Sequence, residues 1–175
     1  HREDMNQMKI KAKRLSDTAK LPTYGSEKAA CADLYCDLRV DKCIDLNPAN
    51  VDFKHMEYSG DCFDRVHIAP HETIKIPTGW AFQPPEGYAG FIYARSGLAT
   101  KNGLRPSNCV GVCDEDYSGE YIVAVHNDTD KYQFINNGDR IAQLEFRPYE
   151  QAEFELVDEL DKTERGASGF GSTGT

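Results

Sequence analysis

A run of acidic and aromatic residues, GVCDEDYSGEY, occupies residues 111–121 between two apolar stretches. Apolar strands on both sides predict a hairpin. Five residues would lie near its tip: Asp114, Glu115, Asp116, Tyr117 and Glu120. A carboxylate held there could orient or deprotonate a water molecule. Taken alone, however, such a segment is more often an acidic turn that solvates a hairpin, and a tyrosine in it is more often a packing residue.

A second segment with useful chemistry is ARSGLA, residues 94–99. Arg95, Ser96 and Gly97 offer a guanidinium fork, a hydroxyl and an unhindered backbone N–H, which together match the oxygens of a phosphate. The common structural alternative is an ordinary turn at the end of a strand, and the short pattern does not distinguish the two.

Two further segments contain single polar residues among apolar neighbours. In NNGDRIAQLEF, residues 136–146, Asn-Gly predicts a tight turn, after which Arg140 and Gln143 would face outward. In AACADLYCDL, residues 29–38, the carboxylate of Asp33 could bind a cation or its water shell. A solvating glutamine and a turn-capping aspartate are the commoner explanations.

The chain ends in RGASGFGSTGT, residues 165–175. Its glycines, with Arg165, Ser172 and Thr173, suggest a phosphate-binding segment, but neither a P-loop nor a dinucleotide fingerprint is present. A disordered terminus is the simple interpretation. The arginine and the lone ring of Phe170 instead favour a lid that closes on a nucleotide.

The composition narrows the class of protein. With 175 residues the chain fits one domain, and a net charge of −9 argues against nonspecific binding to nucleic acid or anionic membranes. No apolar run approaches a membrane span and no secretory signal opens the chain, so we expect a soluble, cytoplasmic protein. Six cysteines are present, and we expect buried, reduced thiols rather than disulfides.

Many short β-like runs separated by turn residues predict an all-β fold, a compact antiparallel barrel or sandwich. Such runs are expected over TIKIPTGWAF (residues 73–82), GFIYARSG (90–97), YIVAVHN (121–127) and RIAQLEF (140–146). Helix is expected only in short stretches such as residues 100–104. We expect residues 1–8 to be a tag remnant or disordered start, and residues 9–150 to form the barrel with an insertion near 39–71. Residues 151–175 would form an acidic spacer and a flexible glycine-rich arm.

The five segments occur in the order ACADL, ARSGLA, NCVGVCDEDYSGE, GDRIAQLEF and RGASGFGSTG. In residues and order they resemble the five motifs of the trimeric dUTPase family, from about Lys9 to the C-terminus. The resemblance implies a jelly-roll β-barrel and a homotrimer with three active sites at its subunit interfaces. It also implies hydrolysis of dUTP to dUMP and pyrophosphate with Mg²⁺.

The resemblance also implies roles for residues around the nucleoside. Asp114 would activate the water that attacks the α-phosphorus, and Tyr117 would pack under the deoxyribose and leave no room for a 2′-hydroxyl. Asn108 and Gly111 would belong to the hairpin whose backbone binds uracil. Cytosine would then leave buried donors and acceptors unpaired, which costs binding free energy.

The remaining implied roles concern the triphosphate and the arm. Arg95, Ser96, Gly97 and Gln143 would contact phosphate or its water, and Asp33 would hold a water on the magnesium. The arm would contribute a γ-phosphate ligand, a ring stacked on uracil and further phosphate donors: Arg165, Phe170, Gly171, Ser172 and Thr173.

The chain departs from the family pattern at three motif positions: Cys31, Ala94 and Ser168. The stretch between Asp33 and Arg95 is also longer than compact members of the family need. None of these changes removes a proposed functional side chain. Two other functions stay open: a dCTP deaminase or bifunctional deaminase and dUTPase of the same fold, and a nucleotide-binding regulatory protein whose partner surface is the insertion.

Overall fold

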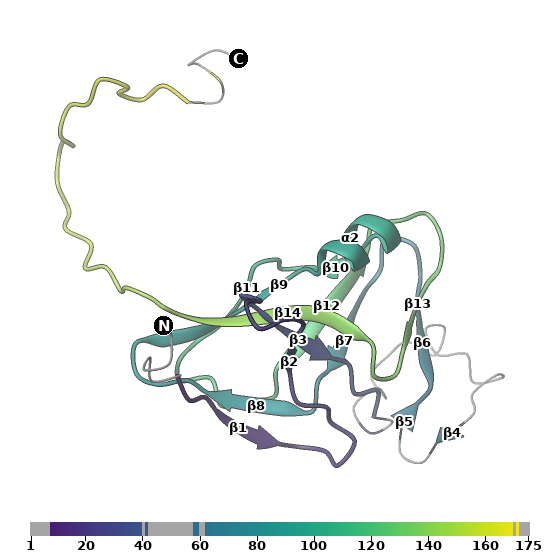
Figure 1. Ribbon diagram of the computed structural model, residues 1–175. Helices are drawn as coiled ribbons and strands as arrows, with labels where there is room; N and C mark the ends of the chain where they lie inside the picture. The colour runs from purple at the N-terminus through teal and green to yellow at the C-terminus, as the bar shows by residue number, and fades with distance from the viewer. Residues whose placement is uncertain (1–7, 40, 42–57, 60–61, 170, 172–175) are drawn as a thin grey trace.

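The computed structural model of the chain describes residues 8–39, 41, 58–59, 62–169 and 171 (Figure 1). Over these residues the chain forms short antiparallel strands and one helix. The elements are β1 (Lys11–Arg14), β2 (Thr23–Tyr24), β3 (Ala32–Tyr35), β4 (Tyr58–Ser59), β5 (Cys62–Phe63), β6 (Arg65–Ile68), β7 (Thr73–Pro77), β8 (Trp80–Gln83), β9 (Tyr88–Tyr93), α2 (Ser96–Asn102), β10 (Leu104–Pro106), β11 (Gly111–Cys113), β12 (Ile122–Asn127), β13 (Gln133–Asn136) and β14 (Arg140–Pro148).

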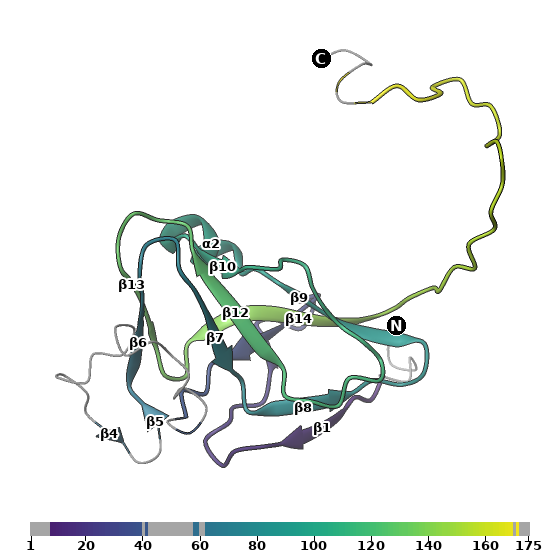
Figure 2. The ribbon, with the colours of Figure 1, turned by 180° about the vertical axis from the view of Figure 1, so that it is seen from behind.

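Two larger sheets carry the body. The five-stranded sheet has the order β11-β9-β14-β3-β2, and the three-stranded sheet has the order β10-β12-β7. The pairs β1-β8 and β13-β6 extend this framework, as the front and back views show (Figures 1 and 2). Side chains from both sheets meet in one buried core, including Leu34, Ile76, Ile92, Val123 and Leu144. The all-β class is therefore confirmed.

Two local predictions were wrong. Residues 73–82 form two strands, because the chain turns at Thr78 and Gly79 between β7 and β8. The helix covers Ser96–Asn102 rather than residues 100–104, and it ends where Gly103 adopts the left-handed conformation at φ 65°. In both places a glycine with positive φ sets the boundary.

Gly79 should be intolerant of a side chain. Its φ is +77°, and an added Cβ would lie 2.4 Å from the Ala19 Cβ and 2.7 Å from the Asp37 Oδ2. We expect Gly79→Ala to lower the free energy of unfolding by about 2–4 kcal/mol, from backbone strain and overpacking together. Urea unfolding measures this change. Gly138→Ala is the matched control, since Gly138 has φ +81° but open space around it; equal losses in the two variants would contradict the packing argument.

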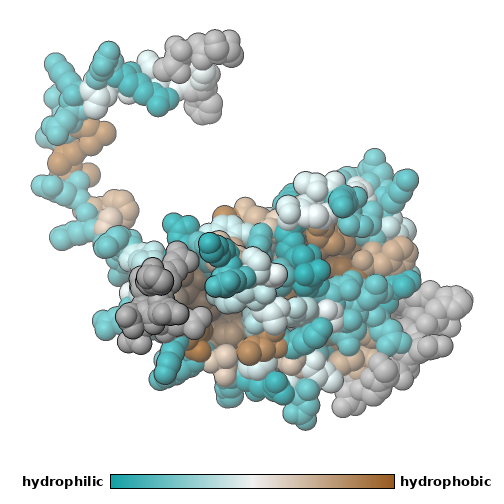
Figure 3. Space-filling view, in the orientation of Figure 1, coloured by the Kyte–Doolittle hydropathy of each residue, from teal (hydrophilic) through white to brown (hydrophobic). Residues whose placement is uncertain are grey.

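The C-terminal segment leaves the body after β14 and carries no strand or helix over residues 149–169 (Figures 1 and 2). Its apolar side chains stand out among hydrophilic neighbours (Figure 3). Phe154, Leu156 and Leu160 are 95%, 99% and 87% exposed. Apolar side chains exposed in this way can be buried when the segment binds to another protein surface.

The predicted insertion, 39–71, falls partly outside the described residues. Within it, β6 pairs with β13 of the body, and Val66 and Ile68 are fully buried. The described end of this segment is thus part of the core. In the part of the chain that the structure describes, no helix has both the length and the apolar character needed to cross a membrane.

Candidate active site

The segment that begins at Asn108 places the first functional residues. Strand β11 pairs with β9, so Gly111 lies opposite Ile92 and Cys113 opposite Gly90. A Cβ on Gly111 would lie 3.3 Å from the Ile92 Cβ and 3.5 Å from the Asn108 Nδ2. The Asn108 amide thus lies against the strand beside Gly111, and the tighter approach to residue 111 is that of Ile92 on β9.

A cavity of about 230 Å³ lies beside this segment and brings together four of the predicted residues: Asn108, Gly111, Asp114 and Tyr117. Apolar residues from β9 and β12, including Ile92 and Val123, form other parts of its wall. A small cavity with apolar walls and a few polar groups fits a planar base and a sugar.

Tyr117 is fixed within this cavity by three contacts. Its ring stacks on Tyr121 at a centroid distance of 6.1 Å, and its Oη donates a hydrogen bond of 2.8 Å to the main-chain carbonyl of Glu120. A Cβ on Gly119 would lie 2.6 Å from the same Oη, so glycine is needed for the ring to fold over the loop. Tyr121, itself buried, packs its ring on Phe82 at 4.8 Å and thereby ties the loop to the core.

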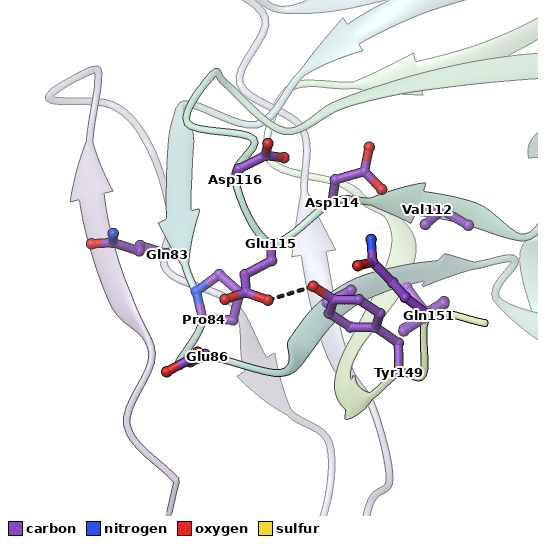
Figure 4. Close-up of a pocket in the computed structure, with 11 residues that line it drawn as sticks. Gln83, Pro84, Glu86, Val112, Asp114, Glu115, Asp116, Tyr149 and Gln151 are labelled. Atoms are coloured by element: carbon purple, nitrogen blue, oxygen red, sulfur yellow. Dashed lines mark hydrogen bonds between the residues drawn. The ribbon is translucent and has the colours of Figure 1, made fainter. Parts of the chain in front are cut away.

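The carboxylates of this loop differ in what they bind. Glu115 accepts hydrogen bonds from the Gly87 N–H at 3.1 Å and from the Tyr149 Oη at 2.5 Å, as Figure 4 shows for the tyrosine. The hydrogen bond to Glu115 raises the pKa of Tyr149. Glu120 is held by Arg39 and the Gly79 N–H. Both glutamates are therefore occupied by structural contacts.

Asp114 is exposed and has no hydrogen bond or ion pair to its side chain from any of the residues that the structure describes. It lines the base-sized cavity and also a larger one of about 980 Å³ (Figure 4). The larger cavity is acidic, since Glu86, Glu115 and Asp116 also line it. Asp114 thus lies where the two cavities meet, with its oxygens available to a water molecule.

Residues from three other motifs gather across β3, β14 and the end of β9. Gln143 lies opposite Asp33 on one side and Tyr93 on the other. The Asp33 carboxylate pairs with the Arg95 Nε at 2.8 Å and with the Arg140 Nη1 at 3.3 Å. The Gln143 Nε2 donates to the Ala94 carbonyl at 2.8 Å. These contacts form a cationic cluster, which we call the arginine cluster, of Asp33, Arg95, Arg140 and Gln143.

Arg140 is the residue of this cluster that the sequence argument did not select. It was expected to face outward, and its side chain is 50% exposed, yet it contacts the same carboxylate as Arg95. The sequence signal that could have selected Arg140 is its position just after the Asn-Gly turn, in the same motif as Gln143. Ser96 and Gly97 begin α2 directly after Arg95 and keep their hydroxyl and N–H beside the cluster. Over the described ranges, no group of three or more His, Cys, Asp or Glu residues is arranged to hold a metal ion.

The arginine cluster and Asp114 of one chain lie far apart. Cys113, the neighbour of Asp114, is opposite Gly90, and Arg95 follows Gly90 by five residues of extended chain. At about 3.3 Å per residue this separates them by roughly 16 Å. This distance joins backbone positions, so Asp114 and Arg95 of one chain belong to separate parts of the surface.

The arm lies away from both places (Figure 1). Within it the Arg165 Nε donates to the Ser168 carbonyl at 2.7 Å, and Gly171 is exposed. Phe170, Ser172 and Thr173, for which substrate contacts were predicted, lie outside the described residues.

The cysteines are free thiols in the described part of the chain, but not all are buried. Cys36 and Cys62 are buried, whereas Cys109 is exposed, which corrects the expectation for that residue. Burial raises the pKa of Cys36 to about 12 and that of Cys113 to about 11. Cys31 is half-buried, and Cys43 lies outside the described residues.

Among the five cysteines that the structure describes, we expect Cys109 to react first with iodoacetamide at pH 8. It is exposed, while only about one Cys113 thiol in a thousand is ionised at that pH. Mass spectrometry of partly alkylated protein gives the order of reaction. A nucleotide analogue in the cavity should slow labelling of Cys109, because its neighbour Asn108 lines that cavity. Faster labelling of Cys36 than of Cys109 would contradict the burial pattern.

Comparison with known proteins gives a consistent picture. The dUTPase family model matches residues 63–174. A deoxyuridine 5'-triphosphate nucleotidohydrolase of Desulfitobacterium hafniense is 40% identical over 97% of this chain and 99% of its own. One of Legionella pneumophila is 38% identical over 96% of this chain and 95% of its own.

Solved structures agree with these relatives. The dUTPase of Staphylococcus bacteriophage 80alpha, solved with dUPNHPP, has a TM-score of 0.73 and 26% identity over 95% of this chain and 99% of its own. A dUTPase from phage phi11 of S. aureus, with a species-specific insert, has a TM-score of 0.66 and 22% identity over 89% of this chain and 99% of its own. The chain therefore belongs to the dUTPase family and has its all-β jelly-roll fold.

Proposed function

We propose that this protein hydrolyses dUTP to dUMP and pyrophosphate, and so supplies dUMP for dTMP synthesis and limits uracil in DNA. The observation that carries the proposal is the cavity that Asn108, Gly111 and Tyr117 line together with Asp114, whose carboxylate is paired with none of the described residues. The similar phage 80alpha enzyme was solved with dUPNHPP, which supports a deoxyuridine nucleotide as substrate. We place this activity in the cytoplasm.

In this cavity Asn108 and the backbone around Gly111 would bind uracil, and Tyr117 would lie under the deoxyribose. Asp114 would accept a proton from the attacking water. The water oxygen forms a bond to the α-phosphorus while the bond to the bridging oxygen breaks, and pyrophosphate leaves with the bonding electrons. The choice of Asp114 over its neighbours rests on Glu115 and Glu120 being bound elsewhere.

The donor set suits Mg²⁺ that is carried mainly by the triphosphate, because Mg²⁺ sites on nucleotides usually combine phosphate oxygens with one or two carboxylates. Asp33 already pairs with Arg95 and Arg140, so it would contact the ion through a water rather than directly. When bound, Mg²⁺ would neutralise part of the phosphate charge. Arg95 and Gln143, with the Ser96 hydroxyl and the Gly97 N–H, would hold the phosphates or their water.

The proposed enzyme is a homotrimer with shared active sites. The separation of about 16 Å between Asp114 and Arg95 along β9 is the supporting geometry. A second copy would bring its arginine cluster to the first copy's cavity, and an arm would close it with Arg165, Phe170, Gly171, Ser172 and Thr173. The exposed apolar residues of the arm, such as Phe154 and Leu156, would be buried on a neighbouring subunit.

A direct test compares pyrophosphate release from dUTP, dTTP, UTP and dCTP under identical conditions with Mg²⁺. We expect dUTP to be preferred by at least about a hundredfold. The cytosine of dCTP would leave cavity groups unpaired, the 2′-hydroxyl of UTP would clash with Tyr117, and the 5-methyl group of dTTP would add bulk in a small cavity. Ammonia release from dCTP is measured in parallel. Clear deamination, or no preference for dUTP, would overturn the proposal.

A further inference from the structure

A buried ionic cluster joins the end of the Tyr117 loop to the segment that follows β3. It contains Asp37, Arg39 and Glu120, whose side chains are only 1%, 9% and 10% exposed. The Arg39 Nη2 pairs with the Glu120 Oε1 at 2.5 Å, and the Arg39 Nε lies 3.0 Å from the Asp37 Oδ2. That second contact is within ion-pair distance but lacks hydrogen-bond geometry. We call these three residues the buried ionic cluster.

The cluster is held rigidly from both sides. The Asp37 Oδ1 accepts a hydrogen bond of 2.6 Å from the Thr18 hydroxyl, and the other Glu120 oxygen accepts one of 3.3 Å from the Gly79 N–H. Burial alone would lower the pKa of Arg39, but the hydrogen bond and charge of Glu120 outweigh it and raise the pKa. Arg39 therefore stays charged and is matched by two carboxylates.

Glu120 connects this cluster to the candidate sugar site. Its side chain belongs to the cluster, while its main-chain carbonyl accepts the hydrogen bond from the Tyr117 Oη. Both Glu120 and Tyr117 line the cavity of about 230 Å³. Among the described residues, removing Arg39 would leave the buried Glu120 carboxylate with one long hydrogen bond, from the Gly79 N–H. An uncompensated buried charge is costly, so the side chain would turn toward water and move its own carbonyl.

We propose that Arg39 is a positioning residue for sugar selection: it holds Glu120, whose carbonyl fixes the Tyr117 ring against which the deoxyribose packs. This inference rests on the proposed dUTPase function. It adds a residue 81 positions away in sequence from Glu120, outside the five motifs, to the machinery that separates dUTP from UTP. With the ring less firmly held, a 2′-hydroxyl would be accommodated more easily.

The test measures kcat/KM for dUTP and for UTP in Arg39→Met and in the unaltered enzyme. We call the kcat/KM for dUTP divided by that for UTP the dUTP-to-UTP ratio. In Arg39→Met we expect this ratio to fall about three- to tenfold, the effect of one weakened hydrogen bond. The KM for dUTP should rise while kcat changes little, because Asp114 makes no contact with the cluster. Arg39→Lys keeps the positive charge but not the planar guanidinium group, so its dUTP-to-UTP ratio should lie between those of Arg39→Met and the unaltered enzyme.

A double-mutant cycle separates positioning from general destabilisation. Tyr117→Phe removes the same hydrogen bond from its other end, so Arg39→Met should lower the ratio much less in that background. Full additivity in the cycle would overturn the proposal. Arg65→Met is the matched control: it removes an arginine that binds Asn136 in the β6-β13 pair, and it should leave the ratio unchanged.

If Arg39→Met does not fold, Glu120→Gln replaces it, since the neutral amide removes the ion pair with Arg39 and leaves the Arg39 charge matched by Asp37. The ratio should again fall, and an unchanged ratio in this folded variant would refute the inference. Loss of kcat for dUTP and UTP by equal factors would also refute it, as the sign of a merely structural role. If the unaltered enzyme does not prefer dUTP, the proposed function itself fails, which is a distinct result.

Discussion

Asp114→Asn is expected to reduce kcat for dUTP by about 10²–10⁴-fold, the usual contribution of a positioned general base. Asparagine has nearly the same shape but cannot take a proton from water. Because the Asp114 side chain makes no hydrogen bond or ion pair with the described residues, its replacement should disturb neither the loop nor the fold. Binding of dUPNHPP, measured by calorimetry, should therefore stay within a few-fold of the unaltered protein.

Asp116→Asn is the matched control for this prediction. Asp116 is also exposed and lies two residues farther along. It lines the cavity of about 980 Å³ and a further one beside Lys11 and Lys13, but not the cavity of about 230 Å³ that contains Asn108 and Asp114. Asp116→Asn removes one negative charge, as Asp114→Asn does. If the loss of that charge changes only the electrostatic potential at the site, turnover should change by less than about threefold. Undiminished hydrolysis in Asp114→Asn, or an equal loss in both variants, would refute the assignment of the base.

Removal of residues 165–175 is expected to leave a folded protein with kcat/KM for dUTP lowered by about 10²-fold or more. The described residues of this segment are exposed and contribute nothing to the core. The thermal midpoint should thus remain within about 2 °C, while the substrate loses a closing lid and its cationic contact. Circular dichroism and pyrophosphate release give the two readouts, and unfolding of the truncated chain would show that the arm is structural.

Mixed assemblies test whether sites are shared between chains. The truncated chain retains Asp114, and the full-length Asp114→Asn chain retains the arm, so each lacks what the other has. Refolding the two together should restore activity well above that of either alone if the arm acts on a neighbouring subunit. Activity that stays at the sum of the two separate proteins would mean that each arm serves its own chain.

The local patterns carried much of the fold. Alternating apolar residues and turn glycines predicted the strands now seen as β9, β12 and β14. This works because successive side chains of a strand point to opposite faces of the sheet. The same patterns missed β10 and β13, which are only three and four residues long and pair with β12 and β6. They also joined β7 to β8, because the close approach of Ala19 that requires a glycine at residue 79 comes from sixty residues earlier.

The site shows the same division. The sequence determined which groups are available: the acidic loop, the RSG segment, the glutamine and the glycine-rich arm, all recognisable from neighbouring residues. Residue types alone could not rank Asp114, Glu115 and Glu120, and it was the resemblance to the dUTPase family that selected Asp114. Only the tertiary structure shows that the other two are engaged, since Glu115 is bound by Tyr149 and Glu120 by Arg39, and both partners come from distant segments. Hydrogen bonds across such separations depend on how the sheets pack, and that packing left Asp114 as the carboxylate of the three with its oxygens free for water.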